Sequence, residues 1–251
     1  MEEVIWNQGE RLIPGVTHDL AKVIRHRSSY FFFRKVIEHD LAFIRKEAIP
    51  IRIVDLGCGV GHGCRILSEL PNSQIVGVDH SLECLEDAQV NYGGENIDYI
   101  AENLIEYIPG MPEFDYVVFR GVFEHVTGGL QLALSTKWRH RLIFDVPYNE
   151  PMGKNPYHVQ FEIREESFSK YPDIELFFQD LNGVIHDRGH RSVNPNMMIC
   201  VWTNPKLRRV SDCQMTFPLP AWKPERIARL SSLKWSKMTQ KLRQSLQNLI
   251  N

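Results

Sequence analysis

The sequence has few cysteines and no long apolar run, and both absences narrow the class of protein. The five cysteines include no C-x-x-C pair; they are Cys58, Cys64, Cys84, Cys200 and Cys213. An odd number of cysteines without metal-ligand spacing predicts reduced thiols in a cytosolic protein. No apolar run approaches the ~20 residues that a transmembrane helix needs, and the acidic start at Met1, broken by Pro14, does not resemble a secretory signal. We therefore expect a cytoplasmic protein.

Internal repeats and low-complexity segments are also missing from the 251 residues. The net charge of −2 hides an asymmetry between body and tail. Residues 206–251 hold ten basic and two acidic side chains, a charge of +8, whereas residues 1–205 hold 19 basic and 29 acidic ones, a charge of −10. A mildly acidic body with a basic tail is the organisation that follows.

The end of the basic tail, residues 225–251, is compatible with a helix. An apolar stripe with flanking lysines recurs there at helical spacing, formed by Trp235, Met238, Leu242, Leu246 and Leu249. Two interpretations stay open: a helix at an anionic membrane interface, and a helix docked on its own domain or on a second subunit. Leu230 and Leu233 fall away from the stripe and slightly favour docking. We do not expect nucleic acid as a partner, because no aromatic stacking platform accompanies the basic residues.

From residue 51 short apolar strands alternate with helical segments. The predicted strands are 51–56, 74–78, 99–100, 114–119 and 141–146. This alternation predicts an α/β fold with a Rossmann-like, doubly wound, mostly parallel sheet. After Pro147, residues 162–170 are compatible with a helix. Residues 174–178 and 197–203 are expected to pair as a C-terminal antiparallel hairpin.

A glycine loop follows the first of these strands, in Ile53-Val-Asp-Leu-Gly-Cys-Gly-Val-Gly-His-Gly63. Glycine permits tight turns and removes the Cβ that would keep a ligand away from the main chain. The helix that begins beyond the loop offers unpaired N–H groups to a polar ligand. Asp79 ends the second strand, 24 residues after Asp55. An acid at that place accepts hydrogen bonds from ribose hydroxyls in nucleotide-binding α/β units.

Two cofactor classes use such a loop. Dinucleotide enzymes need G-x-G-x-x-G, which is not present, because the sixth position is His62 when counted from Gly57 and Cys64 when counted from Gly59. The spacing G-x-G-x-G, with an acid two residues before it, resembles the first motif of class I S-adenosylmethionine-dependent methyltransferases. The resemblance implies S-adenosyl-L-methionine as cofactor and methyl transfer as activity.

The resemblance extends from about Ile51 to Pro147. Tyr99-Ile-Ala-Glu-Asn-Leu104 stands where the family usually has Gly-Asp-Ala, so Asn103 takes the place of the acid that accepts from the adenine amino group. An Asn carbonyl can still accept that bond. Phe114 to Val126 is similar to the fourth-strand motif of small-molecule methyltransferases, which often ends Glu-His-Val. The cofactor-binding residues that the resemblance implies are Asp55, Gly57, Cys58, Gly59, Gly61, Asp79, His80, Asn103, Leu104 and Arg120.

Two flanking segments resemble methyltransferases associated with bacterial surface-glycan synthesis: Gly9-Glu-Arg-Leu-Ile-Pro-Gly15 and Asn155-Pro-Tyr-His-Val159. Such enzymes commonly methylate sugar hydroxyls, so the resemblance implies O-methylation of a sugar or another small-molecule hydroxyl. The expected parts of the chain are an N-terminal helical cap at 1–50, the methyltransferase domain at 51–205 and a basic helical extension at 206–251.

A hydroxyl acceptor must lose its proton, and a positioned base typically contributes ~10²–10⁴-fold to the rate. His125 is the first candidate for the base, because it follows the fourth strand and the carboxyl ends of parallel strands face the ligand crevice. His158, in a Pro-flanked loop after the fifth strand, is the second. Glu124 is a candidate for orienting either imidazole. The alternatives are that His125 only shapes the pocket and that His158 is merely exposed.

The methionine carboxylate of the cofactor needs a cation or a donor. Arg27 and Tyr30 are candidates, and Arg120, beside the cofactor crevice, is better placed. Asp145 has no second or third carboxylate at a convincing spacing, so no metal site is expected. Two alternative functions stay open: methylation of nucleic acid or protein, which only the basic tail supports, and a non-catalytic S-adenosylmethionine-binding subunit, which the departure at Asn103 permits.

Overall fold

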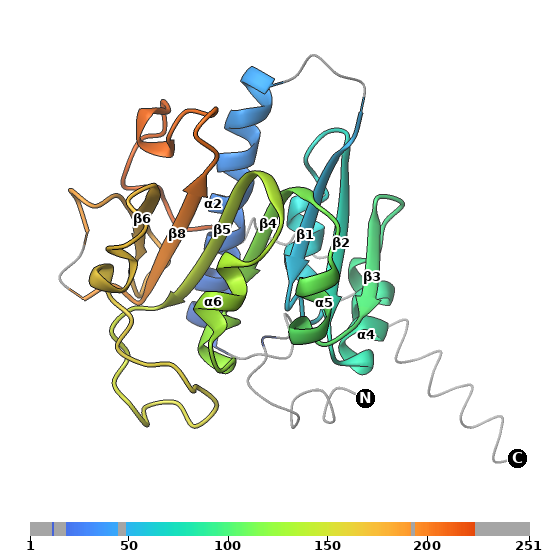
Figure 1. The fold of residues 1–251 in the computed structure, drawn as a ribbon, viewed down its shortest axis with the longest axis horizontal. Helices are drawn as coiled ribbons and strands as arrows, with labels where there is room; N and C mark the ends of the chain where they lie inside the picture. Colours follow the sequence, from blue (N-terminus) through green and yellow to red (C-terminus); the bar gives the residue numbers. More distant parts are fainter. Residues whose placement is uncertain (1–11, 13–18, 45–48, 192–193, 224–251) are drawn as a thin grey trace, which may run out of the picture.

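Strands and helices alternate as expected in the computed structural model, which describes residues 12, 19–44, 49–191 and 194–223. Eight strands form one sheet in the order β3-β2-β1-β4-β5-β8-β6-β7 (Figure 1). Their bounds are β1 Ile51–Leu56, β2 Ser73–Asp79, β3 Ile97–Ala101, β4 Phe114–Arg120, β5 Trp138–Pro147, β6 Ile174–Gln179, β7 Ile185–His186 and β8 Met197–Thr203. The pairs from β3 through β5 are parallel. The predicted Rossmann-like, mostly parallel fold is confirmed.

The last three strands complete the same sheet. β6 pairs with β8 in antiparallel orientation, as expected, and β8 also pairs antiparallel with β5. The short β7 lies on the outer edge of β6. The prediction of a helix over 162–170 is wrong, because only a 3₁₀ turn, η2 (Glu165–Phe168), forms there. Glu162 has a left-handed backbone with φ 55°, and Pro172 disfavours a helical conformation at the residue before it.

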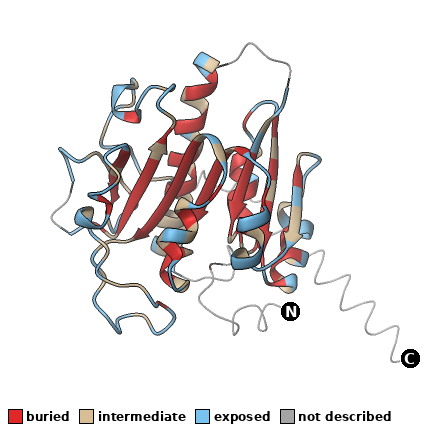
Figure 2. Cartoon of the chain, in the orientation of Figure 1, coloured by how far each residue is buried: buried red, intermediate tan, exposed pale blue. Residues whose placement is uncertain are grey.

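Helices cover both faces of the sheet. On one face lie α2 (Leu20–Ile44), α3 (His62–Leu67) and α4 (Leu82–Tyr92), and on the other lie α5 (Leu104–Gly110) and α6 (Gly129–Leu134). Successive strand side chains enter these two cores in turn, as Ile53 and Val54 of β1 do. Figure 2 shows the central strands buried along most of their length. Among the described helices, none is long and apolar enough to cross a membrane.

The long helix α2 shares a core with the sheet. Its residues Tyr30, Phe32, Phe33 and Ile37 are at most 2% exposed and pack in the same cluster as β1, β4 and β8. A buried ion pair adds to this packing: Arg141 of β5 donates from Nε and Nη2 to the Asp40 carboxylate, at 2.6 Å each. The boundary expected at residue 50 stays a prediction, but the described part before it packs directly on the sheet.

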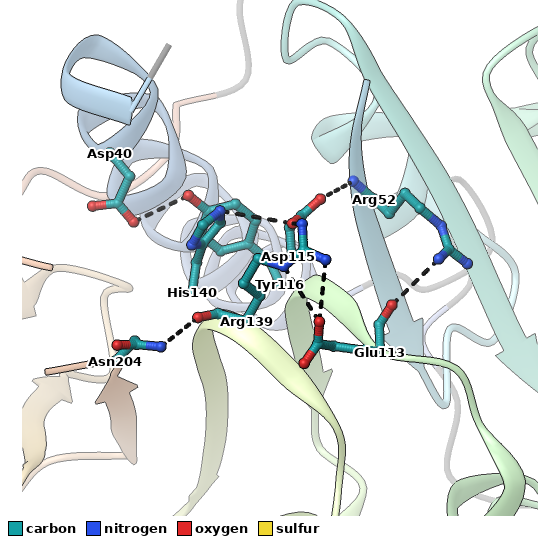
Figure 3. Close-up of polar contacts among 8 residues, drawn as sticks. All are labelled: Asp40, Arg52, Glu113, Asp115, Tyr116, Arg139, His140 and Asn204. Carbon is teal, nitrogen blue, oxygen red and sulfur yellow. Dashed lines mark hydrogen bonds and ion pairs between the residues drawn. The ribbon is translucent and has the colours of Figure 1, made fainter. Parts of the chain in front are cut away.

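A polar network joins the amino ends of β1, β4 and β5 (Figure 3). These strand ends lie at the opposite end of the sheet from the glycine loop. Asp115 accepts from the backbone N of Arg52 at 2.8 Å and pairs with Arg139 at 3.3 Å and His140 at 3.7 Å. Asn204, just after β8, donates to the backbone carbonyl of Arg139 at 2.8 Å. These contacts hold the amino ends of the central strands together and leave the carboxyl ends of the strands for a ligand.

Candidate cofactor and acceptor site

A cavity of about 970 Å³ lies at the carboxyl ends of the parallel strands. Its walls come from the glycine loop after β1, the ends of β2 and β4, the segment after β5 and the amino-terminal half of α2. Ligands of open α/β sheets bind in this crevice. The cavity therefore lies where the sequence predicts the site.

The glycine loop has a left-handed backbone at three positions, with φ of 76° at Gly57, 54° at Gly59 and 79° at Gly61. A Cβ at Gly59 would meet no atom within 4 Å, and Gly59 lines the cavity, so its missing side chain leaves space for a ligand. A Cβ at Gly57 would instead meet Val122, and one at Gly61 would meet Tyr99. Gly61 is not among the residues that line the cavity, and its missing side chain leaves room for Tyr99 rather than for the predicted cofactor contact.

Asp79 supports the loop and also lines the cavity. Its Oδ2 accepts from the backbone N of Gly59 at 2.9 Å, and its Oδ1 accepts from the backbone N of Ser81 at 2.9 Å. A carboxylate oxygen has a second lone pair, so Asp79 can still accept from a ribose hydroxyl. The neighbouring His80 and the loop residue Cys58 line the cavity as well, and their contact with a cofactor stays a prediction.

Asp55 lies beneath the loop and outside the cavity wall. Its carboxyl is fully buried and accepts from Tyr30 Oη at 3.1 and 3.0 Å and from Cys64 Sγ at 3.5 Å. Burial raises the pKa of Asp55 to about 7, although the hydrogen bonds from Tyr30 and Cys64 lower it. Asp55 therefore has a supporting position that joins β1 to α2 and α3, rather than the predicted place in the cofactor pocket.

Asn103 and Leu104 line the cavity beyond β3. The Asn103 side chain caps α5, since its Oδ1 accepts from the backbone N of Ile105 at 2.9 Å. Asp and Asn are both favoured caps, which explains why Asn can stand where the family has Asp. The predicted bond from an adenine amino group would use the second lone pair of the same oxygen.

Arg120 brings a fixed positive charge to the cavity. Its Nε lies 3.3 Å from Oδ2 of the buried Asp145, which also accepts from Ser29 Oγ at 2.8 Å. Burial raises the pKa of Asp145, and Arg120 lowers it. Arg27, the alternative for the methionine carboxylate, lies 4.6 Å from the centre of the Trp222 ring and is not among the lining residues. Arg120 is therefore the better placed of the two.

The three predicted catalytic residues, Glu124, His125 and His158, meet in one wall of the cavity. One possible ligand atom from each lies within 4.8 Å of the other two, and the centres of the imidazole rings are 4.7 Å apart. Glu124 and His125 belong to η1 (Phe123–His125), directly after β4, whereas His158 comes from the long segment after β5. We call residues 124–126 and 150–160 the acceptor wall.

Hydrogen-bond acceptors orient both imidazoles of the acceptor wall. His125 Nδ1 lies 3.1 Å from the backbone carbonyl of Tyr157, and His158 Nδ1 contacts the Glu150 carboxylate. These oxygens only accept, so in the neutral rings each Nδ1 carries the proton and each Nε2 keeps its lone pair. Asn155 Nδ2, a donor, lies 3.0 Å from His158 Nε2 and agrees with that tautomer.

Four hydrogen bonds hold the two parts of the acceptor wall together. The backbone N–H groups of Val159 and Gln160 donate to the carbonyl of Glu124 at 2.6 and 3.2 Å. Gln160 Nε2 donates to the carbonyls of Phe123 and Val126 at 2.7 Å each. We call these four bonds the 159–160 clamp. The clamp brings together histidines that stand 33 residues apart in the chain.

Sequence reasoning missed His26, His62 and Glu150 in the cavity wall. Burial lowers the pKa of His62 to about 3, with nearby arginines adding to the effect, and lowers that of His26 well below its usual value. Both rings are therefore neutral at pH 7. The position of His62 inside the glycine motif and that of Glu150 just after the fifth strand could have indicated them. His26 has no comparable signal.

Two predictions lie outside the described residues. They concern the segment 9–15, of which Leu12 alone is described, and the apolar stripe in 225–251. Leu12 is 6% exposed and lines the cavity. The interpretations of the stripe stay predictions.

Part of this chain is similar to known proteins. Residues 53–141 match the family model of a methyltransferase domain. A trans-aconitate 2-methyltransferase of Streptomyces avermitilis is 34% identical over 84 residues, which are 32% of this chain and 31% of that protein. A malonyl-[acyl-carrier protein] O-methyltransferase of Bacillus cereus is 28% identical over 145 residues, which are 55% of this chain and 53% of that protein. The matched segments thus span about half or less of these curated relatives.

Solved structures agree on the fold. The plantazolicin methyltransferase BpumL, solved with SAH, superimposes with a TM-score of 0.52 at 14% identity, covering 72% of this chain and 84% of that one. The N-terminal domain of EvdMO1, solved with SAH and D-fucose, has a TM-score of 0.53 at 13% identity, covering 80% and 96%. These likenesses confirm the Rossmann-like architecture.

Proposed function

We infer that this chain is an S-adenosylmethionine-dependent methyltransferase. The cavity beyond β1 and β2 carries the inference, because Gly59 leaves open space there beside the accepting carboxylate of Asp79. The match of residues 53–141 to a methyltransferase domain and the two methyltransferase relatives support it.

The lining residues suit one orientation of the cofactor. The ribose hydroxyls donate to Asp79, and the adenine lies beside Asn103 and Leu104. The methionine carboxylate pairs with Arg120, whose position Asp145 fixes. In this orientation the transferred methyl group faces the acceptor wall.

The acceptor that we propose is a hydroxyl of a sugar or another small molecule. Two imidazoles with Nε2 lone pairs line the acceptor wall, and a hydroxyl needs a group that takes its proton, whereas an ionised carboxylate acceptor does not. In the step, the hydroxyl oxygen bonds to the methyl carbon as the carbon–sulfur bond breaks, and the proton passes to the acceptor wall. The products are a methyl ether and S-adenosylhomocysteine.

Calorimetry tests the cofactor assignment. Wild-type protein is expected to bind S-adenosylmethionine and S-adenosylhomocysteine but not NAD. Asp79→Ala should weaken binding by about 10–100-fold, since a hydrogen bond to a charged group contributes about 1.5–3 kcal/mol. The matched control is Asp98→Ala, which removes an exposed carboxylate from the adjacent strand β3 and should bind like wild type. Equal affinity of the two folded variants would contradict the site.

A panel of sugar and small-molecule hydroxyl acceptors, read by release of S-adenosylhomocysteine, tests the acceptor class. His125→Ala should keep cofactor affinity and slow transfer by ~10²-fold or more. Loss of cofactor binding in this variant would make His125 a residue of the cofactor pocket instead. Full activity would move the proton-accepting role to His158.

A further inference from the structure

We propose that Glu124, His125 and His158 form a binding site for a divalent transition-metal cation in the acceptor wall. Metal binding by these residues does not depend on the proposed function, but the use of the metal in catalysis rests on it. The proposal replaces the expectation of no metal site, which considered carboxylates around Asp145. The three residues are brought together by the 159–160 clamp, which sequence spacing does not indicate.

The donor set and its spacing suit such a cation. Two imidazole nitrogens and one carboxylate oxygen are the ligands of many zinc and iron(II) sites, whereas Mg²⁺ and Ca²⁺ prefer all-oxygen sets. One possible ligand atom from each of the three residues lies within 4.8 Å of the other two. Ligand atoms of a tetrahedral site with bonds of ~2.0–2.1 Å are about 3.4 Å apart, so the side chains need to close by roughly 1.5 Å at most.

The surroundings of the histidines are those of metal ligands. A metal-bound imidazole typically donates its other N–H to a carboxylate or a backbone carbonyl, which fixes the ring and its tautomer. His158 contacts the Glu150 carboxylate through Nδ1, and His125 contacts the Tyr157 carbonyl through Nδ1. Both Nε2 lone pairs are thereby set for a cation. Binding would displace the Asn155 amide from His158 Nε2.

The burial of Glu124 and the access of the three residues to the cavity also favour a bound cation. Glu124 is 3% exposed, so a cation that it binds would be shielded from bulk water. Glu124, His125 and His158 all line the cavity, so a cation held by three protein ligands would keep a coordination position open toward it.

The open position would take the acceptor hydroxyl. A bound divalent cation makes an oxygen ligand more acidic, so the hydroxyl can lose its proton to water near neutral pH. The alkoxide would then bond to the methyl carbon as the carbon–sulfur bond breaks. In this form of the step the histidines hold the cation, and the proton-removing role passes from imidazole to metal.

Titration of the untagged, chelator-treated full-length chain with Co²⁺ tests the proposal. We expect one Co²⁺ per chain, with visible absorption bands from nitrogen and oxygen coordination, displacement by Zn²⁺ and no displacement by equal concentrations of Mg²⁺. Absence of a one-to-one Co²⁺ complex would overturn the proposal.

Variants locate the site. His125→Ala, His158→Ala and Glu124→Gln should each abolish the Co²⁺ bands, and Glu150→Gln should weaken Co²⁺ affinity by about 10–100-fold. His190→Ala is the matched control, because His190 forms an exposed pair with Asp187 at 2.7 Å and should not matter. Retention of the bands in the first three variants would refute the assignment. Calorimetry with S-adenosylhomocysteine on the same samples separates the outcomes: binding without Co²⁺ bands refutes only the metal, and no binding by wild type refutes the proposed function.

Discussion

Replacing Asp55 with asparagine should change how the stability of this chain depends on pH. The Asp55 carboxyl is fully buried, and burial raises its pKa from 3.8 to about 7. A raised pKa means that the folded state prefers the protonated, neutral carboxyl. The stabilisation is therefore complete below about pH 4, where the unfolded chain is protonated too, and is lost as the pH rises through about 7.

The size of the effect follows from linkage. A difference of one pH unit in pKa corresponds to about 1.36 kcal/mol, so between pH 5 and pH 8 this carboxyl should remove about 2–3 kcal/mol from the free energy of unfolding. The asparagine side chain of the variant does not titrate, has nearly the same volume and keeps an acceptor for Tyr30 Oη. For a chain of this length the difference is on the order of 5–10 °C in Tm.

Urea and thermal unfolding of both proteins without cofactor, at pH 5, 6, 7 and 8, measure the difference directly. Buried groups such as His26 and His62 titrate in both proteins, so their contributions cancel when the two pH profiles are subtracted. Tyr30→Phe, which removes a donor that lowers the Asp55 pKa, should make the loss of stability with rising pH continue to higher pH. Parallel profiles for wild type and Asp55→Asn would refute the reasoning.

Two further predictions concern the glycine loop and the clamp. Gly59→Ala should lose about 1 kcal/mol of stability for its left-handed backbone and bind S-adenosylmethionine at least ~10-fold more weakly. Gly61→Ala should lose a further ~1–3 kcal/mol, because its Cβ would meet Tyr99 and Ala88; equal losses in urea unfolding would contradict this difference. Gln160→Ala removes two side-chain bonds to η1 and should leave cofactor affinity unchanged while local amide exchange becomes about 10-fold faster. Unchanged exchange would show that the two backbone bonds hold the acceptor wall alone.

The glycine-loop half of the cavity could be predicted because strand ends and short motifs place its residues. Gly59, Asp79 and Asn103 each lie at or just after the end of a parallel strand, and all three line the cavity. Asp55 does not line the cavity as expected. Successive side chains of a strand point to opposite faces, and the Asp55 side chain points toward α2, like that of Ile53. The residue types of a motif alone do not distinguish a residue that lines the cavity from one that supports the loop.

The arrangement of residues 124–126 and 150–160 in the cavity wall could be predicted only in part. Glu124 and His125 follow β4 and share its motif, but the contact of His158 with Glu150 depends on an irregular segment without periodicity. The clamp that sets its position has main-chain carbonyls as all of its acceptors and main-chain N–H groups as two of its four donors, and these groups leave no trace in residue types. His26 comes from a helix whose polar and apolar residues do not separate clearly by face, so its place in the cavity wall also needed the structure.

Two of the four clamp bonds are donated by main-chain N–H groups, and this has a consequence for sequence variation. Any non-proline residue at position 159 supplies the same N–H group, so the side chain at this position can be exchanged while the bond to the Glu124 carbonyl is kept. Met152, Tyr157 and Val159 are 80%, 55% and 52% exposed, and their replacement leaves both sheet cores untouched. Under the proposed function, the side chain at position 157, which lines the cavity, can therefore vary the fit of the acceptor while the residues proposed to hold the cofactor stay the same. A library at position 157, with Met152 and Val159 as exposed control positions outside the cavity wall, tests that variation at little risk to folding.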